Sequence, residues 1–134
     1  MNLQVGVKVI IQNSQGHVLL LKRASQFLLP ADSKEAWDIP GGRIERDENL
    51  HDALAREVKE ETGATLVDTP KLLIAQDIFV PNRDLHVVRL TYTLEQNLDT
   101  IVLSDEHTDY QWFTKSDLQN VRVEPYLAEA LQLL

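Results

Sequence analysis

Three glutamates, Glu57, Glu60 and Glu61, lie three and four residues apart in a segment with helical character. At about 100° per residue, Glu60 lies roughly 60° to one side of Glu57 and Glu61 roughly 40° to the other. Like charges this close on one helix face repel each other, so a cation is expected among them. Carboxylate oxygens suit a hard divalent cation such as Mg²⁺ or Mn²⁺. The spacing therefore predicts a metal site, with a solvated helix carrying Glu–Lys pairs as the alternative.

The apolar residues of the same segment support the metal interpretation. They recur at helical spacing and should face the core. These residues are Leu50, Ala53, Leu54 and Val58. In projection along the helix axis, Glu57 and Glu61 fall between apolar positions, so the inner stripe becomes acidic in its second half. Carboxylates that are buried or half-buried need a paired charge or a metal, and Lys59 points elsewhere.

The stretch from Gly42 to Ala64 resembles the sequence box of the Nudix hydrolases. All fixed positions of that box are occupied as the family pattern requires. They are Gly42, Glu48, Arg56, Glu57, Val58, Glu60, Glu61 and Gly63. Ala64 is a soft departure, since a larger aliphatic residue is usual there, and it concerns packing rather than chemistry.

This resemblance implies both a fold and an activity. The fold is an α/β (α+β) structure, an α/β/α sandwich with a mixed β-sheet between helices, formed by a single domain over residues 1–134. The activity is divalent-metal-dependent hydrolysis of a diphosphate linkage in a nucleoside diphosphate joined to another group. The Mg²⁺ or Mn²⁺ would neutralise phosphate charge and lower the pKa of a bound water.

The resemblance also implies roles for the polar residues of the box. The metal shell would comprise the three helix carboxylates and a backbone carbonyl of the double glycine. These ligands are Glu57, Glu60, Glu61 and Gly42, with Gly41 as the alternative carbonyl. Arg56 would orient Glu57 and pair with Glu48.

A general base must remove a proton from the attacking water, and its source differs among similar proteins. Glu57 is one candidate. The polar loop 104–109 supplies others, of which Glu106 is preferred because similar proteins often place a glutamate before the strand that contains Trp112. The alternative for Glu106 is a solvated loop charge.

Two cations at the end of an expected strand, Lys22 and Arg23, are candidates for binding the substrate phosphates. Adjacent strand residues face opposite sides, so only one of them is expected at the site. Arg23 is preferred because its guanidinium matches phosphate oxygens with two hydrogen bonds. Possible stacking partners for a base, each more often a core residue, are Phe27, Trp37, Phe79 and Tyr92. The histidines interpreted as surface or loop residues rather than ligands are His51, His86 and His107.

Composition limits the classes of partner. The chain has 134 residues, 43% of them hydrophobic and 25% charged, and its net charge is −8. This charge argues against a surface for polymeric nucleic acid, which is held mainly by Lys and Arg. No apolar run is long enough to span a membrane. The absence of cysteine is compatible with a cytoplasmic enzyme, expected to act as a monomer or homodimer.

Substrate preference is the least constrained feature. The expected substrate is a small nucleotide, a (d)NTP or oxidised dNTP that releases NMP. ADP-ribose or a nucleotide sugar is the alternative, weakened by Val80 where some ADP-ribose hydrolases carry a proline. Two rival classes are a catalytically weak nucleotide-binding sensor module and an acidic helix that recruits a basic partner.

The elements that must position these residues follow from hydrophobic periodicity and turn signals. A half-buried strand is predicted at 5–11 and forms a hairpin with 18–21, and a loop is predicted at 29–34. A helix at 49–62 should stop at Gly63. The remaining expected elements are strands at 37–40, 72–80, 85–94 and 110–113, a turn capped by Ser116 or Asp117, and a helix opened by Glu124 and Pro125.

Overall fold

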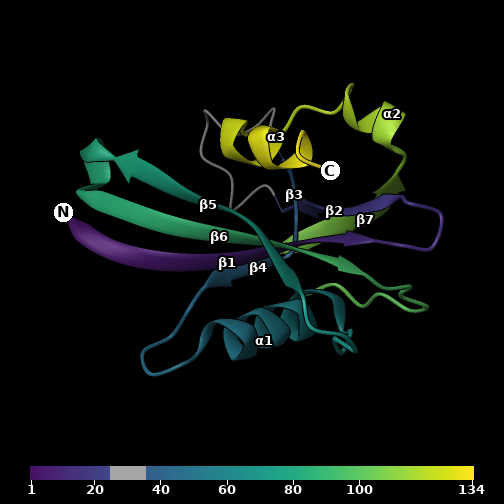
Figure 1. Ribbon diagram of the computed structural model, residues 1–134, viewed down its shortest axis with the longest axis horizontal. Coiled ribbons are helices and arrows are strands. Elements are labelled where there is room, and N and C mark those ends of the chain that lie inside the picture. The colour runs from purple at the N-terminus through teal and green to yellow at the C-terminus, as the bar shows by residue number, and fades with distance from the viewer. Residues whose placement is uncertain (25–35) are drawn as a thin grey trace.

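The computed structural model describes residues 1–24 and 36–134 as three layers, with a mixed sheet between helices (Figure 1). Helix α1 lies against one face of the sheet, and α2 and α3 lie on the opposite face. The strands are β1 (Asn2–Gln12), β2 (Val18–Arg23), β3 (Trp37–Asp38), β4 (Gly41–Arg43), β5 (Lys71–Val80), β6 (Leu85–Glu95) and β7 (His107–Phe113). The helices are α1 (Leu50–Thr62), the 3-10 turn η3 (Pro81–Arg83), α2 (Lys115–Leu118) and α3 (Pro125–Leu131). The predicted sandwich is confirmed.

The sheet combines parallel and antiparallel pairs. Its strand order is β3-β2-β1-β6-β5, while β4 pairs with β1 and β7 pairs with β2. The parallel pair β1–β6 runs from Asn2 opposite Leu85 to Gln12 opposite Glu95. β4 and β7 are both antiparallel to their partners. The central β1 therefore brings the segment before α1 next to the middle of the sheet.

The sheet has a hydrophobic core on each face. On the α1 face, the buried residues include Val7, Val9, Ile11, Leu54 and Val58. On the α3 face, they include Ile10, Val18, Leu20, Phe113, Leu127 and Ala130. The prediction that the first strand is only half-buried is wrong at Ile10, which is 0% exposed. Helix α3 packs on this second face of the sheet. The alternating pattern of apolar residues in β1 did not predict that both faces of the strand are buried.

Helix α1 begins and ends where local signals placed it. The Asn49 side chain accepts a hydrogen bond from the Asp52 N–H at 2.8 Å and so caps the first turn. Gly63, in the left-handed conformation, donates its N–H to the Lys59 carbonyl and ends the helix. These caps set the two ends of the helix, and its apolar residues Ala53, Leu54 and Val58 face the sheet.

Other predicted boundaries change in the structure. β7 begins at His107 rather than Tyr110, because its first residues pair with β2. The strand predicted at 37–40 ends at Asp38, and a further strand, β4, forms at Gly41–Arg43 because β1 supplies a partner. Helix α2 is capped by Thr114 rather than Ser116 or Asp117. The predicted loop at 29–34 lies outside the described residues, and no helix among those described is long and apolar enough to cross a membrane.

Candidate metal centre

The site is built where the C-terminal half of α1 meets the glycine backbone of β4. Gly41 has a φ of 145°, and a Cβ there would lie 2.2 Å from the Val7 carbonyl oxygen. A Cβ on Gly42 would lie 2.7 Å from the carboxylate of Glu57. A side chain at either position would therefore displace backbone or the carboxylate, and the glycines permit close approach.

Glu61 is the most buried carboxylate of this region, with 3% of its surface exposed. Its two carboxylate oxygens accept from the Gly41 N–H at 3.2 and 3.3 Å. No ion pair within the described part of the chain reaches it. Burial raises the pKa of Glu61 to about 8, although the charge of Lys8 and the Gly41 N–H act in the opposite direction. A buried carboxylate in such surroundings favours a cation as its partner.

Glu57 lies one turn before Glu61 and faces Gly42. Its side chain is 14% exposed, and its Oε1 accepts from Arg56 Nη1 at 3.0 Å. Burial raises the pKa of Glu57, and the hydrogen bond from Arg56 partly offsets that effect. Two carboxylates of α1 thus converge on the double glycine, as the helix spacing predicts.

Arg56 connects α1 to the loop before it. Its Nε donates to Glu48 Oε2 at 2.7 Å and its Nη2 donates to Glu48 Oε1 at 2.9 Å, a fork-to-fork pair. This pair lowers the pKa of Glu48 to about 2. Nη2 also donates to the Arg43 carbonyl at 3.3 Å. The expected contacts of Arg56 with Glu48 and Glu57 are therefore present.

Glu60 occupies a different environment from Glu61. Its side chain is 56% exposed and lies 3.4 Å from Arg56 Nη1. Its carboxylate is absent from the three-residue group, described below, that could hold a metal. The role of Glu60 as a metal ligand stays a prediction.

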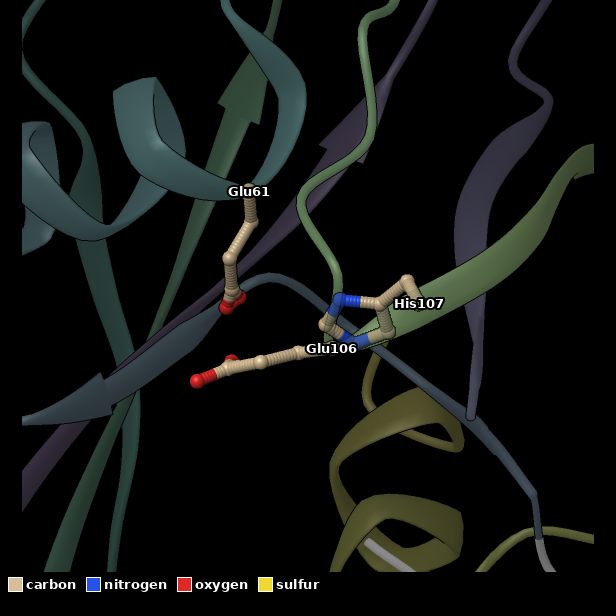
Figure 2. Close-up of side chains that lie close together, drawn as sticks. All are labelled: Glu61, Glu106 and His107. Atoms are coloured by element: carbon tan, nitrogen blue, oxygen red, sulfur yellow. The ribbon is translucent and has the colours of Figure 1, made fainter. Parts of the chain in front are cut away.

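Glu106 and His107 approach Glu61 from the loop before β7 and from its first residue. These three side chains each offer a ligand atom, and those atoms lie within 4.8 Å of one another. Figure 2 shows the Glu61 carboxylate, reaching down from α1, beside the Glu106 carboxylate and the His107 ring. The Ala24 N–H donates to the Glu106 carbonyl at 2.7 Å, which joins this loop to the end of β2. Glu106, singled out from the sequence, thus lies at the predicted centre.

The assignment of His107 to the surface needs correction. The residue is only partly exposed, and burial lowers its pKa. Its Nδ1 is buried and has no hydrogen-bond partner among the described residues. The only sequence signal for a role of His107 was its position next to Glu106. That signal was not used, because residues 104–109 were predicted to form a polar loop.

Lys8 and Asp38 form a second charged pair that sequence reasoning missed. Lys8 Nζ lies 2.8 Å from Asp38 Oδ2, and both side chains are 15% exposed. Burial would raise the pKa of Asp38, but Lys8 lowers it overall. The positive charge of Lys8 also acts to lower the pKa of Glu61, against the effect of burial. The pair joins β1 to β3, so the sequence separation of its members hid it.

The two candidate phosphate-binding cations separate as expected for neighbours in a strand. Lys22 is exposed, with Nζ 6.0 Å from the centre of the Trp37 ring. Arg23 pairs in register with His107 and is half-buried. The positive charge of Arg23 contributes to lowering the pKa of both His107 and Asp38. Arg23 is therefore the cation of the two with an electrostatic link to the cluster.

The aromatic candidates for stacking on a base have other contacts. Tyr92 is buried in the core, with its ring edge-on to His51. Trp37 packs edge-on against Phe113. Phe79 is 56% exposed and stacks on His86, with ring centres 4.4 Å apart. Phe27 lies outside the described residues.

Comparisons with known proteins identify the family and agree with the fold. A family model for the NUDIX domain matches residues 2–134. The nucleoside triphosphatase NudI of Salmonella agona (strain SL483) is 30% identical over 118 residues, which cover 81% of this chain and 80% of that protein. The MutT NUDIX hydrolase of Burkholderia pseudomallei has a crystal structure that matches with a TM-score of 0.83 at 26% identity, covering 100% of this chain and 99% of that one.

A further relative is matched over a shorter region. The m7GpppN-mRNA hydrolase NUDT17 of Danio rerio is 44% identical over 62 residues, which cover 46% of this chain. Those residues make up 20% of that protein, so the chain corresponds to a minor part of its length.

Proposed function

This chain belongs to the NUDIX domain family and is a Nudix hydrolase, and on that premise we propose that its substrate is a small nucleotide. The substrate would be a (d)NTP or oxidised dNTP, cleaved at a diphosphate linkage with release of NMP. The reaction would depend on Mg²⁺ or Mn²⁺. The nucleoside triphosphatase activity named for the Salmonella relative, matched over most of both chains, supports this choice.

One observation carries the proposal: α1 places the buried Glu61 and the largely buried Glu57 against the side-chain-free backbone of Gly41 and Gly42. Oxygen donors of this kind suit a hard divalent cation. When bound, that ion supplies charge neutralisation at the phosphates and a lower pKa for a bound water.

The residues of the chain divide the remaining work. Glu57, Glu60 and Glu61, with the Gly42 carbonyl, would hold the cation. Arg56 orients Glu57 through the 3.0 Å hydrogen bond.

Outside α1, Glu106 would accept the proton of the attacking water, and its proximity to Glu61 supports this role. Arg23 would bind substrate phosphate, supported by its register with His107. Lys22 lies beside Trp37 and is the weaker candidate.

A substrate panel tests the proposal. The purified chain would be titrated with Mg²⁺ while products are separated from dNTPs, oxidised dNTPs, ADP-ribose, sugar nucleotides and dinucleoside polyphosphates. We expect the highest kcat/KM for a nucleoside triphosphate, with NMP and pyrophosphate as products. A higher kcat/KM for ADP-ribose or a sugar nucleotide than for any nucleoside triphosphate would contradict the proposed substrate class.

The same panel separates the two rival functions. A sensor module would bind nucleotide without turnover, and an acidic adaptor would do neither. The Glu61→Gln variant is the matched control for contaminating phosphatase. We also propose that the protein is cytoplasmic and acts as a monomer or homodimer. It would act on single nucleotides rather than on polymeric nucleic acid, which the net charge of −8 supports.

A further inference from the structure

We propose that His107 is a direct nitrogen ligand of the divalent cation that Glu61 binds, so that the centre has a mixed nitrogen and oxygen donor set. The inference rests on the metal dependence in the proposed function. It adds a ligand that lies outside the Gly42–Ala64 segment, 43 residues after Ala64.

The positions of the donor atoms support this assignment. A ring nitrogen of His107 and a carboxylate oxygen of Glu61 lie within 4.8 Å of each other. Two ligands that are each about 2.1 Å from one cation can be no more than about 4.2 Å apart. Donors at 90° to each other on an octahedral ion are about 3.0 Å apart, so each side chain must shift by a few tenths of an ångström to about 1 Å to close around an ion. Figure 2 shows both groups on the same side of the Glu106 side chain.

The hydrogen bonding of His107 gives a second, independent reason. Its Nδ1 is buried and has no partner among the described residues. A buried polar atom left without a partner is destabilising, so most such atoms in native proteins are satisfied. A cation coordinated at this nitrogen would satisfy it.

The backbone around His107 holds the ring in place. His107 lies opposite Arg23 in the β2–β7 ladder. Its N–H donates to the Ser104 carbonyl at 3.3 Å, and the neighbouring Glu106 carbonyl accepts from Ala24. A ligand on the end of a paired strand is positioned more rigidly than one on a free loop. Glu106, beside the two ligands, would accept the proton of the attacking water, as in the proposed function.

An imidazole ligand has a consequence for metal preference. Imidazole suits the later first-row transition metals, whereas Mg²⁺ and Mn²⁺ are both suited to oxygen ligands, and affinity for nitrogen and oxygen sites rises from Mn²⁺ to Co²⁺. The centre should therefore bind Co²⁺ more tightly, relative to Mg²⁺, than an all-oxygen site would. Replacing His107 with Asn should reduce the ratio of Co²⁺ to Mg²⁺ affinity by about tenfold, the low end of the loss seen when a metal site is perturbed.

Pulsed electron paramagnetic resonance on the Mn²⁺-loaded protein tests ligation without any measurement of activity. We expect nitrogen modulation from a coordinated imidazole in the wild type, assigned by selective labelling with ¹⁵N-histidine. The signal should disappear in His107→Asn and persist in His51→Asn and His86→Asn. Circular dichroism and thermal unfolding would establish that each variant is folded.

The outcomes separate this inference from the proposed function. Absence of imidazole modulation in the wild type, or its persistence in His107→Asn, would overturn the inference even if Mg²⁺-dependent hydrolysis is normal. Modulation without turnover of any nucleotide would support the ligand while removing the proposed activity. Calorimetric titration of Co²⁺ and Mg²⁺ gives the affinity ratio as a second readout, and an unchanged ratio in His107→Asn would count against ligation.

Discussion

Glu48 and Glu61 are carboxylates of the same short region in opposite electrostatic settings. Glu48 receives two hydrogen bonds from Arg56, and its pKa falls to about 2. Glu61 is buried without an ion-pair partner among the described residues, and its pKa rises to about 8. Glu48 thus has an arginine ion-pair partner, whereas no ion pair among the described residues reaches Glu61, on which Lys8 acts only by its charge. The first arrangement stabilises a loop, and the second leaves a buried carboxylate that a metal ion can bind.

Substitution of Glu61 should show the largest difference between the two settings. We expect Glu61→Gln to lower kcat/KM by about 10³-fold or more, because the amide keeps the shape but loses the charge that holds the metal. Glu48→Gln should lower it by about tenfold, since Glu48 acts only through Arg56. Steady-state hydrolysis of the preferred nucleotide at saturating Mg²⁺ measures both. Equal losses in the two variants would erase the proposed division of roles.

The stability of the metal-free protein should reveal the same contrast through pH. The folded state binds the Glu61 proton with a pKa of about 8, against 4.5 for an ordinary glutamate. Protonation of Glu61 therefore stabilises the folded state, and this contribution to the free energy of unfolding is fully present below about pH 4.5 and is lost as pH rises through 8. Relative to wild type, Glu61→Gln should gain on the order of 3 kcal/mol between pH 5 and pH 8.

Urea denaturation in the presence of a chelator measures this gain. Glu48 behaves in the opposite sense, since its lowered pKa gives stability above about pH 4.5 that is lost as pH falls toward 2. Glu48→Gln should therefore show a constant difference from wild type between pH 5 and pH 8. If the free energy of unfolding changes with pH in the same way for wild type and Glu61→Gln, Glu61 is not held protonated in the metal-free protein.

Arg56 links the two settings, and its loss should affect both activity and stability. We expect Arg56→Gln to lower kcat/KM by about 10²-fold, because Glu57 loses the hydrogen bond that orients it. The free energy of unfolding should fall by about 1–3 kcal/mol, because Glu48 and Glu57 both lose a charged partner.

Arg46→Gln is the matched control for the Arg56 variant. Arg46 is exposed in the same loop, so its substitution should change stability by no more than about 0.5 kcal/mol. Enzyme assays and urea titrations of both variants provide the comparison. A loss of activity in Arg56→Gln that matches Arg46→Gln would show that the arginine does not orient the site.

The smallest effect should come from the cap of α1, which lies beside Glu48. Asn49→Ala removes the hydrogen bond to the Asp52 N–H and should cost about 1 kcal/mol of stability. Activity should stay within about twofold, because the Glu61 end of the helix remains packed on β4. Thermal unfolding and kcat/KM of the same preparation measure the two effects. A large loss of activity would mean that the two ends of α1 are not independent.

Prediction from sequence succeeded where the contacts are local. The ends of α1 follow from Asn49 and Gly63, whose hydrogen bonds stay within four residues of the chain. The Arg56 pair with Glu48 also lies within eight residues. The Lys8–Asp38 pair was missed because its members meet only after β1 and β3 join one sheet.

Helical periodicity places Glu57 and Glu61, but not Glu60, among the apolar positions of the inner stripe. The structure agrees, since Glu61 is 3% exposed and the Glu60 side chain is 56% exposed. The assignment of Glu60 to the metal shell came from the family resemblance and from the spacing of the three carboxylates. His107 was misassigned because its environment depends on the register of β7 against β2.

The amino-acid sequence alone determined the acidic helix, its stop at Gly63, the double glycine and the family that these residues share. Such features depend on residue type and short spacing, which are written directly in the chain. Only the tertiary structure decided that Asn49 caps the helix, that Glu61 is buried without an ion pair among the described residues, and that His107 joins Glu61 and Glu106. Burial and charge separation depend on strand pairing between distant segments, and no local pattern encodes those distances.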